Sequence, residues 1–133
     1  MTKRILIIDN EKTICDLIDG ILSGYGYEAL RAYDSESGFK LIPIEKPDLL
    51  LIDATSDDLK GIELCKKIKK RSSMRHLPII LMIKKRSALN ISKRVRELIS
   101  ALVEKPIQDK QLLRKVGQFI IKADEKTMPE YFD

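Results

Sequence analysis

The sequence has few cysteines and no long hydrophobic run. Among its 133 residues, the two cysteines, Cys15 and Cys65, fall on apolar faces of predicted helices. This position indicates small core side chains rather than a disulfide framework or a cysteine metal site. The longest apolar runs hold about five residues, against roughly 18 in a membrane-spanning helix. Residues 1–4 lead into a predicted strand without a signal-peptide profile. We therefore expect a soluble, cytoplasmic protein.

Features typical of nucleotide and nucleic-acid binding are also missing. No glycine-rich phosphate loop follows the first predicted strand, which argues against a flavin or nucleotide module. The formal net charge is +5, and basic residues cluster at positions 66–75, 84–86 and 93–96. Aromatic residues that could stack on bases do not interleave with these clusters. Solvated helix faces are the simpler interpretation, so nucleic-acid binding by this chain is not expected.

Apolar residues follow two alternating periodicities along the chain. Short unbroken apolar runs, typical of strands buried on both faces, lie at residues 5–8 and 49–52. Two further strands are predicted at residues 77–83, where Pro78 stands at the start, and at residues 101–104. A weaker strand signal at residues 27–32 contains Glu28 and Arg31, which suggests a sheet edge. Helical spacing between the runs predicts helices near residues 10–24, 35–44, 61–70, 90–99 and 112–120.

The helix patterns also predict buried faces and helix ends. The first helix should bury Ile14, Leu17, Ile18, Ile21 and Leu22, and the last should bury Leu112, Val116, Phe119 and Ile120. Gly24 suits the left-handed cap that ends the first helix. A serine or aspartate cap should open the second helix, Pro43 should disturb it, and it should finish before Pro47.

Five alternating strand and helix units predict an α/β domain. Parallel strands need crossover connections, and these are right-handed almost without exception. The expected architecture is a five-stranded parallel sheet with helices on both faces, a doubly wound, flavodoxin-like (βα)5 sandwich. The chain has the usual length of one domain. We expect that domain over residues 1–122, with residues 123–133 forming a C-terminal tail or the start of a linker.

Three of the predicted buried strands end in ionisable or amide side chains. Asp9 and Asn10 follow the first strand, Asp53 ends the third and Lys105 follows the fifth. The carboxyl ends of parallel strands meet at one edge of a sheet, so these side chains should converge there. An oxygen ligand set without histidine or thiolate suits Mg²⁺. Two neighbouring carboxylates repel unless a cation lies between them, and Lys105 and a divalent metal would supply that charge.

This set of groups predicts phosphoryl transfer. A carboxylate beside Mg²⁺ and an ammonium is a competent nucleophile toward phosphorus, and the product is an aspartyl phosphate. The metal and Lys105 would neutralise charge on the transferring group, which is most of what a protein supplies in this chemistry. Taken singly, each residue has a structural alternative, because Asn10 can cap a helix, Asp53 can open a turn and Lys105 can be a surface residue.

The arrangement resembles the receiver domain of two-component response regulators, the CheY-like proteins, over residues 1 to about 122. The matching segments are residues 5–11, 47–53, 77–80 and 105–106, together with Gly61 after the acid. The resemblance implies that a sensor histidine kinase or a phosphotransfer protein phosphorylates Asp53 and that Lys105 contacts the phosphoryl group. It also implies a cis Lys105-Pro106 bond and Mg²⁺ ligands at Asp9, Asn10, Asp53 and the backbone carbonyl of Thr55.

Four positions depart from the pattern of that family. Asn10 replaces the second member of an acidic pair, so Mg²⁺ should bind more weakly unless Glu11 turns in to help. Ile83 replaces a serine or threonine that contacts the phosphoryl group, Leu102 replaces an aromatic residue, and Asp57 replaces a loop proline. The lost hydroxyl contact is worth roughly 1.5 to 3 kcal/mol. Its absence would shift a balanced switch by about tenfold or more.

The leading hypothesis is therefore a Mg²⁺-dependent phosphoacceptor, rather than a turnover enzyme, with non-standard output at Ile83 and Leu102. The alternative is a pseudo-receiver, a protein-interaction module that is independent of phosphorylation. An aspartyl phosphatase is less favoured, because such enzymes usually carry a second aspartate where this chain has Thr55. Expected partners besides the phosphodonor are an effector domain or protein target and a second copy of the chain, with no membrane partner.

Overall fold

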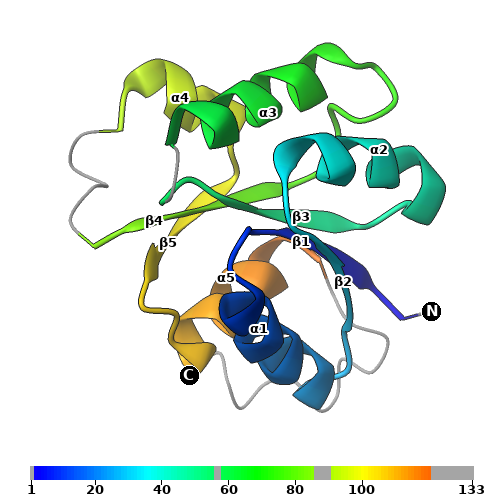
Figure 1. The fold of residues 1–133 in the computed structure, drawn as a ribbon, viewed down its shortest axis with the longest axis vertical. Coiled ribbons are helices and arrows are strands. Elements are labelled where there is room, and N and C mark those ends of the chain that lie inside the picture. The colour runs from blue at the N-terminus through cyan, green and yellow to red at the C-terminus, as the bar shows by residue number, and fades with distance from the viewer. Residues whose placement is uncertain (1, 56–57, 86–90, 121–133) are drawn as a thin grey trace.

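The computed structural model describes residues 2–55, 58–85 and 91–120, and five strands alternate with five helices along these residues (Figure 1). This is the predicted order of elements. The bounds are β1 Arg4–Ile8, α1 Lys12–Gly24, β2 Glu28–Ala32, α2 Ser35–Glu45, β3 Leu49–Asp53, α3 Asp58–Lys70, β4 Ile79–Lys84, α4 Lys93–Leu98, β5 Ala101–Lys105 and α5 Asp109–Phe119. The predicted tail at residues 123–133 lies outside the described residues, and so does Asp57.

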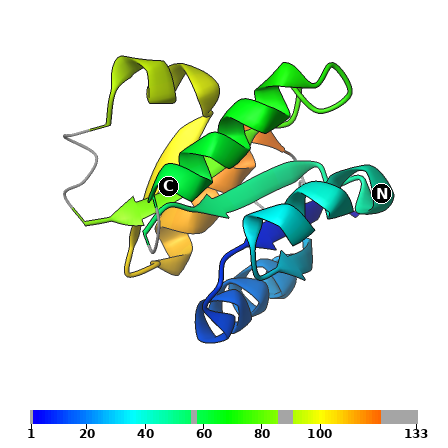
Figure 2. The same ribbon diagram turned by 45° about the horizontal axis from the view of Figure 1, so that its top comes forward.

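The strands form one parallel sheet in the order β2-β1-β3-β4-β5. Helices α1 and α5 cover one face of the sheet, and α2, α3 and α4 cover the other, as two views of the ribbon show (Figures 1 and 2). The doubly wound sandwich is thus confirmed, and β2 lies at an edge as its weak signal suggested. In the described part of the chain, every helix is too short or too polar to cross a membrane.

The core consists of two apolar layers, one on each side of the sheet. Successive strand residues alternate between them, so that Ile5 and Ile7 join the layer under α1 and α5, while Leu6 and Ile8 join the layer under α2, α3 and α4. A strand with helices on both faces must be apolar at every position. This is why the unbroken runs predicted the buried strands so well.

Two residues that the helical spacing placed in the core are exposed. Leu17 is 46% exposed and Phe119 is 37% exposed. The buried stripe of α1 is narrower than predicted, because it consists of Cys15, Ile18 and Leu22, and Leu17 lies to one side of it. In α5 the buried residues are Leu112, Leu113 and Val116, and Ile120 just after the helix is buried in the same layer, as predicted, so Phe119 lies to one side of this stripe.

Several helix ends also differ from the prediction. Gly24 is the last residue of α1, and the left-handed position belongs to Gly26, with φ 90°. Helix α2 opens at the predicted aspartate cap, Asp34, and continues through Pro43 to Glu45, although the proline supplies no N–H to the helix. Helix α3 begins at Asp58, three residues before the predicted start.

Helix α4 begins at Lys93 rather than near residue 90. The Ser92 side chain accepts a hydrogen bond from the Val95 N–H at 3.3 Å and caps the helix. Asn90, the predicted start of the helix, lies outside the described residues. Ile91, which precedes the cap, still packs against the second apolar layer.

Both cysteines are buried free thiols, as predicted, and they should be chemically inert in the folded protein. Burial, together with the Asp9 charge, raises the pKa of Cys15 to about 11, and burial raises that of Cys65 to about 12. Because the thiolate is the reactive species, we expect a thiol reagent at neutral pH to label neither residue in buffer and both in denaturant. Rapid labelling of the native protein, read by intact mass, would contradict this expectation.

Candidate functional site

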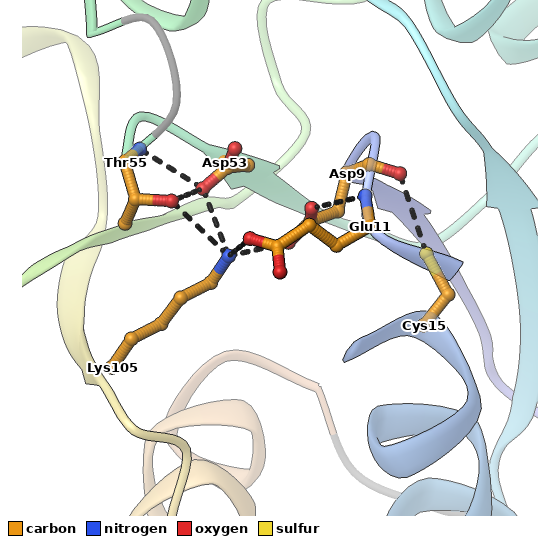
Figure 3. Close-up of polar contacts among 6 residues, drawn as sticks. All are labelled: Asp9, Glu11, Cys15, Asp53, Thr55 and Lys105. Carbon is orange, nitrogen blue, oxygen red and sulfur yellow. Dashed lines mark hydrogen bonds and ion pairs between the residues drawn. The ribbon is translucent and has the colours of Figure 1, made fainter. Parts of the chain in front are cut away.

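Asp9, Asp53 and Lys105 reach the same face of the sheet because of their positions along β1, β3 and β5. Strand side chains alternate between faces with a period of two. Two positions before the three polar residues, the strands place Ile7, Leu51 and Val103 in the layer under α1 and α5. The polar side chains continue that alternation at the carboxyl ends of the strands and converge there (Figure 3). The predicted convergence is therefore observed.

Lys105 lies between the two carboxylates. Its Nζ is 2.7 Å from Asp9 Oδ2 and 3.1 Å from Asp53 Oδ1. The side chains of Asp9, Asp53 and Lys105 are 0%, 8% and 13% exposed, respectively. Burial lowers the pKa of Lys105, but the hydrogen bonds that its ammonium donates to Asp9 and Asp53, together with the charges of the two carboxylates, outweigh burial and raise the pKa above its ordinary value. Lys105 is consequently charged at neutral pH and offsets the repulsion between the two acids.

Each of the two carboxylates is held by a local turn, and the two turns are of the same kind. Asp9 Oδ1 accepts a hydrogen bond from the Glu11 N–H at 3.0 Å, and Asp53 Oδ1 accepts one from the Thr55 N–H at 2.9 Å. An aspartate that bonds to the backbone two residues later forms an Asx-turn, which is a common way to leave a strand. Each turn keeps a carboxylate at the sheet edge while the chain moves on toward the next helix. The strand ends thus position the acids before any ligand is considered.

Asp9 is also tied to the elements on either side of β1. Its backbone N–H donates to Ala32 O of β2 at 3.0 Å, and its carbonyl oxygen accepts the Cys15 thiol of α1 at 3.5 Å. Glu11, which the sequence analysis considered as an additional ligand, is 53% exposed, with its carboxylate 3.9 Å from Lys105 Nζ. Glu11 therefore lies at the outer side of the cluster.

Thr55 makes a side-chain contact that the sequence analysis did not predict. Its hydroxyl donates to Asp53 Oδ1 in a short hydrogen bond and accepts one from Lys105 Nζ at 3.2 Å (Figure 3). The sequence analysis named only the backbone carbonyl of this residue, whose role as a ligand stays a prediction. The sequence did contain a signal for this contact. It is the hydroxyl residue two positions after a strand-terminal aspartate, because an Asx-turn places that residue beside the carboxylate.

A cavity of about 450 Å³ opens beside Asp53. Asp9 and Asn10 line it, as do residues from the start of α2 and from α3, including Glu36, Lys60 and Gly61. The structure therefore brings all three predicted side-chain ligands, Asp9, Asn10 and Asp53, to one space. The cavity leaves room for a small group next to Asp53.

The residues around this cavity fit a magnesium ion better than a zinc ion. Among the described residues, no group of three His, Cys, Asp or Glu side chains is placed to hold a metal. Mg²⁺ needs only one or two protein carboxylates, because it keeps several of its water molecules. Asp9 and Asp53 are two such carboxylates, and Asn10 adds an amide oxygen. Zinc would call for thiolate or imidazole ligands, and the described residues that line this cavity include neither cysteine nor histidine.

Ile83 and Leu102 lie in the other apolar layer. Ile83, near the end of β4, is 2% exposed and packs in the layer under α2, α3 and α4. Leu102 of β5 is partly buried against the same layer. Neither residue can donate a hydrogen bond to a group at Asp53, and the following Lys84 and Lys85 are exposed. The Lys105-Pro106 peptide bond next to the site is cis, as the resemblance implied.

Comparison with known proteins gives a family match over most of the chain. A family model described as the response regulator receiver domain matches residues 5–117. A candidate response regulator of Chloroflexus aurantiacus J-10-fl is 25% identical in sequence and has a similar structure, with a TM-score of 0.81 over 90% of this chain and 98% of that chain. The match thus spans all five strands and almost all of α5.

Two further solved structures show how such a fold occurs in short and long proteins. A CheY-like receiver domain protein of Methanospirillum hungatei JF-1 is 28% identical, with a TM-score of 0.74 over 89% of this chain and 93% of that chain. NtrX of Brucella abortus, solved in complex with ADP, is 29% identical, with a TM-score of 0.77 over 89% of this chain. The match covers 26% of the NtrX chain.

Proposed function

This chain belongs to the response regulator receiver domain family, and we propose that it accepts a phosphoryl group on Asp53 from a histidine kinase or a phosphotransfer protein. The observation that supports this proposal is the position of the Lys105 ammonium, 2.7 Å from Asp9 and 3.1 Å from Asp53, because these two carboxylates line a cavity. A carboxylate held against a cation beside an open space is positioned for attack on phosphorus. We also propose that the chain is located in the cytoplasm, where histidine kinases and phosphotransfer proteins donate phosphoryl groups.

The proposed step is a transfer from phosphohistidine to a carboxylate. An oxygen of Asp53 attacks the phosphorus, the nitrogen–phosphorus bond breaks, and its electron pair stays on the imidazole as it leaves. Lys105 neutralises charge that the phosphoryl oxygens bring to the site. When bound at Asp9, Asn10 and Asp53, Mg²⁺ would supply further charge neutralisation. Attack by water later releases phosphate and restores the carboxylate. Because the chain itself carries the phosphoryl group on Asp53 between these two steps, we propose that it acts as a phosphoacceptor rather than as a turnover enzyme.

The direct test is incubation with Mg²⁺ and acetyl phosphate, followed by intact mass measurement. We expect a mass gain of one phosphoryl group in the parent protein and none in Asp53→Asn. Asp109→Asn, the same chemical change at an exposed aspartate at the start of α5, is a control that should still be phosphorylated. A gain that persists in Asp53→Asn, or no gain in the folded parent, would refute the assignment.

A pseudo-receiver is the second candidate, and Ile83 is the observation that favours it. With Ile83 buried in the apolar layer, a phosphoryl group at Asp53 would find no hydroxyl on β4. NMR amide shifts with Mg²⁺ and beryllofluoride, a phosphoryl mimic, separate the two candidates. A phosphoacceptor shows shifts around Asp53 and Lys105, whereas a phosphorylation-independent module shows none.

We propose that output from the site is non-standard, because Ile83 and Leu102 share an apolar layer and offer no polar contact to Asp53. Phosphorylation would then affect the groups that touch Asp53 directly and the residues of α2 and α3 that line the cavity beside it. The partner that receives the signal would be an effector domain, a separate protein target or a second copy of the chain. NtrX, in which a matching segment is part of a much longer chain, supports an effector domain as one form.

Asn10→Asp is expected to strengthen Mg²⁺ binding about tenfold, because affinity rises with the number of charged ligands. The substitution adds a carboxylate at the cavity that Asp9 and Asp53 already line. The dissociation constant can be measured by following amide shifts in a Mg²⁺ titration. Asn10→Ala, which removes the amide oxygen, should weaken binding. Equal affinities in the three proteins would show that position 10 is not a ligand.

A further inference from the structure

Three hydrogen-bond donors converge on one oxygen of Asp53. They are the Thr55 backbone N–H at 2.9 Å, Lys105 Nζ at 3.1 Å and the Thr55 hydroxyl in a shorter contact, and all three point at Oδ1. Lys105 Nζ also donates to the Thr55 hydroxyl at 3.2 Å. The hydroxyl is therefore polarised by the ammonium and aimed at the carboxylate. Three donors that converge in this way stabilise negative charge at the point where they meet.

We propose that the Thr55 hydroxyl is a phosphoryl-binding group of this site, an inference that rests on the phosphorylation of Asp53 proposed above. It would supply the hydroxyl contact that Ile83 cannot offer from β4. Thr55 would thereby be a catalytic residue, since its side chain touches the transferring group. In this role the hydroxyl acts together with Lys105, while the backbone N–H completes the set.

The change in charge on phosphorylation is the reason for this role. Once Oδ1 forms a bond to phosphorus, the negative charge of the carboxylate is lost, and the phosphoryl oxygens, two bonds from Oδ1, carry the charge instead. Donors that pointed at Oδ1 then pair with those oxygens, because hydrogen bonds to ionised acceptors are the stronger ones. The backbone N–H is fixed by the turn, whereas the Thr55 hydroxyl can follow the charge by rotation about a single bond.

A purely structural role for Thr55 gives a different expectation. The Asx-turn at Asp53 needs only the Thr55 backbone N–H, which every non-proline residue supplies. Valine matches threonine in shape and branching and differs by the absence of the hydroxyl. Thr55→Val therefore keeps the turn and removes the side-chain donor, while Thr55→Ser keeps the donor and removes the methyl group.

The test compares these two variants with the parent by two measurements. The initial rate of phosphorylation by acetyl phosphate should fall about tenfold in Thr55→Val, as expected for loss of one hydrogen bond to a charged group. The dissociation constant for beryllofluoride in the presence of Mg²⁺ should rise by a similar factor. Thr55→Ser should stay within about twofold of the parent in both. If valine disturbs folding, Thr55→Ala removes the hydroxyl with less volume and should show the same losses.

The possible results separate this inference from the proposed function. A parent that is phosphorylated at Asp53, with Thr55→Val and Thr55→Ala reacting at the parental rate, overturns the role of the hydroxyl and leaves the phosphoacceptor assignment intact. An equal loss in Thr55→Ser also overturns it, because the methyl group would then be responsible. If the folded parent itself accepts no phosphate and binds no beryllofluoride, both proposals are wrong.

Discussion

Lys105→Met is expected to lower the rate of Asp53 phosphorylation by about 10² to 10³-fold, the usual effect of removing one preorganised charged or hydrogen-bonding group from a transition state. It should also reduce the free energy of unfolding at neutral pH by about 2 to 3 kcal/mol, somewhat below the range for a fully buried pair because the cavity admits water. Methionine keeps the length of the side chain and removes the charge that separates Asp9 from Asp53.

The stability difference between the parent and Lys105→Met should depend on pH. The pKa of Lys105 is raised above 10.5, so its ion pairs contribute fully below that pH and are lost only as the pH rises through the higher folded value. In Lys105→Met the two carboxylates face each other without a cation. The stability gap between parent and variant should therefore persist below pH 10.5 and narrow as the pH rises through the folded pKa of Lys105.

Lys84→Met is the matched control. Lys84 pairs with Lys105 in the sheet register, and its side chain is exposed. Its loss should change the unfolding free energy by at most about 0.5 kcal/mol and leave phosphorylation close to the parental rate. Urea unfolding at several pH values and phosphorylation time courses provide both measurements. A stability gap for Lys105→Met that does not vary with pH would show that the ammonium does not neutralise the pair.

The arrangement of the site was predictable because it depends on strand ends rather than on side-chain detail. Four consecutive apolar residues before Asp9 and before Asp53 mark strands buried on both faces, and parallel strands bring their carboxyl ends to one edge. Convergence of Asp9, Asp53 and Lys105 follows from that topology alone. Their alternation with core residues then fixes the face on which they meet.

Contacts that a side chain makes with another element or loop could not be predicted in the same way. The basic segment 66–75 was interpreted as a solvated face, yet Lys67 Nζ lies 4.4 Å from the centre of the Phe39 ring. Lys69 Nζ donates to the carbonyls of Arg75 and Leu77, each at 2.9 Å. Such contacts depend on how α2 and α3 pack against each other and on the path of the following loop. Residue spacing along one helix contains no information about either.

The Thr55 hydroxyl belongs to the same class of contact. The turn after Asp53 was predicted, but the direction of the hydroxyl depends on Lys105, which lies 50 residues later in the sequence. Leu17 is a case where a contact was predicted and is not observed. Helical spacing alone made the predicted buried stripe of α1 wider than the observed one. Both cases require the neighbouring element to be in place before the side chain can be assigned.

Gly61→Ala is the second substitution with a large expected effect. A Cβ at Gly61 would lie 2.6 Å from the backbone oxygen of Asp53 and 3.2 Å from the Ala54 Cβ. A backbone atom cannot rotate away, so α3 would have to move off the end of β3. We expect a loss of about 1 to 3 kcal/mol in the free energy of unfolding, the usual result of overpacking. Urea denaturation measures this change directly.

Gly20→Ala provides a control of opposite sign. Gly20 also lies inside a helix, α1, but a Cβ there would meet no other atom within 4 Å. Alanine should therefore stabilise the protein by about 0.5 to 1 kcal/mol, because it has the higher helix propensity. If both alanine variants shift stability in the same direction, the close approach of α3 to Asp53 does not determine the effect at position 61.

Gly61→Ala should also slow phosphorylation, even under conditions where the variant is fully folded. Gly61 lines the cavity beside Asp53, and the atom that its Cβ would displace is the backbone oxygen of Asp53 itself. Small displacements of a reacting group cost rate steeply, up to about 10²-fold for 1 Å. We expect roughly a tenfold loss, whereas Gly20→Ala should react like the parent. A destabilised Gly61→Ala that reacts at the parental rate would mean that α3 yields and the carboxylate keeps its place, in which case the glycine serves packing alone.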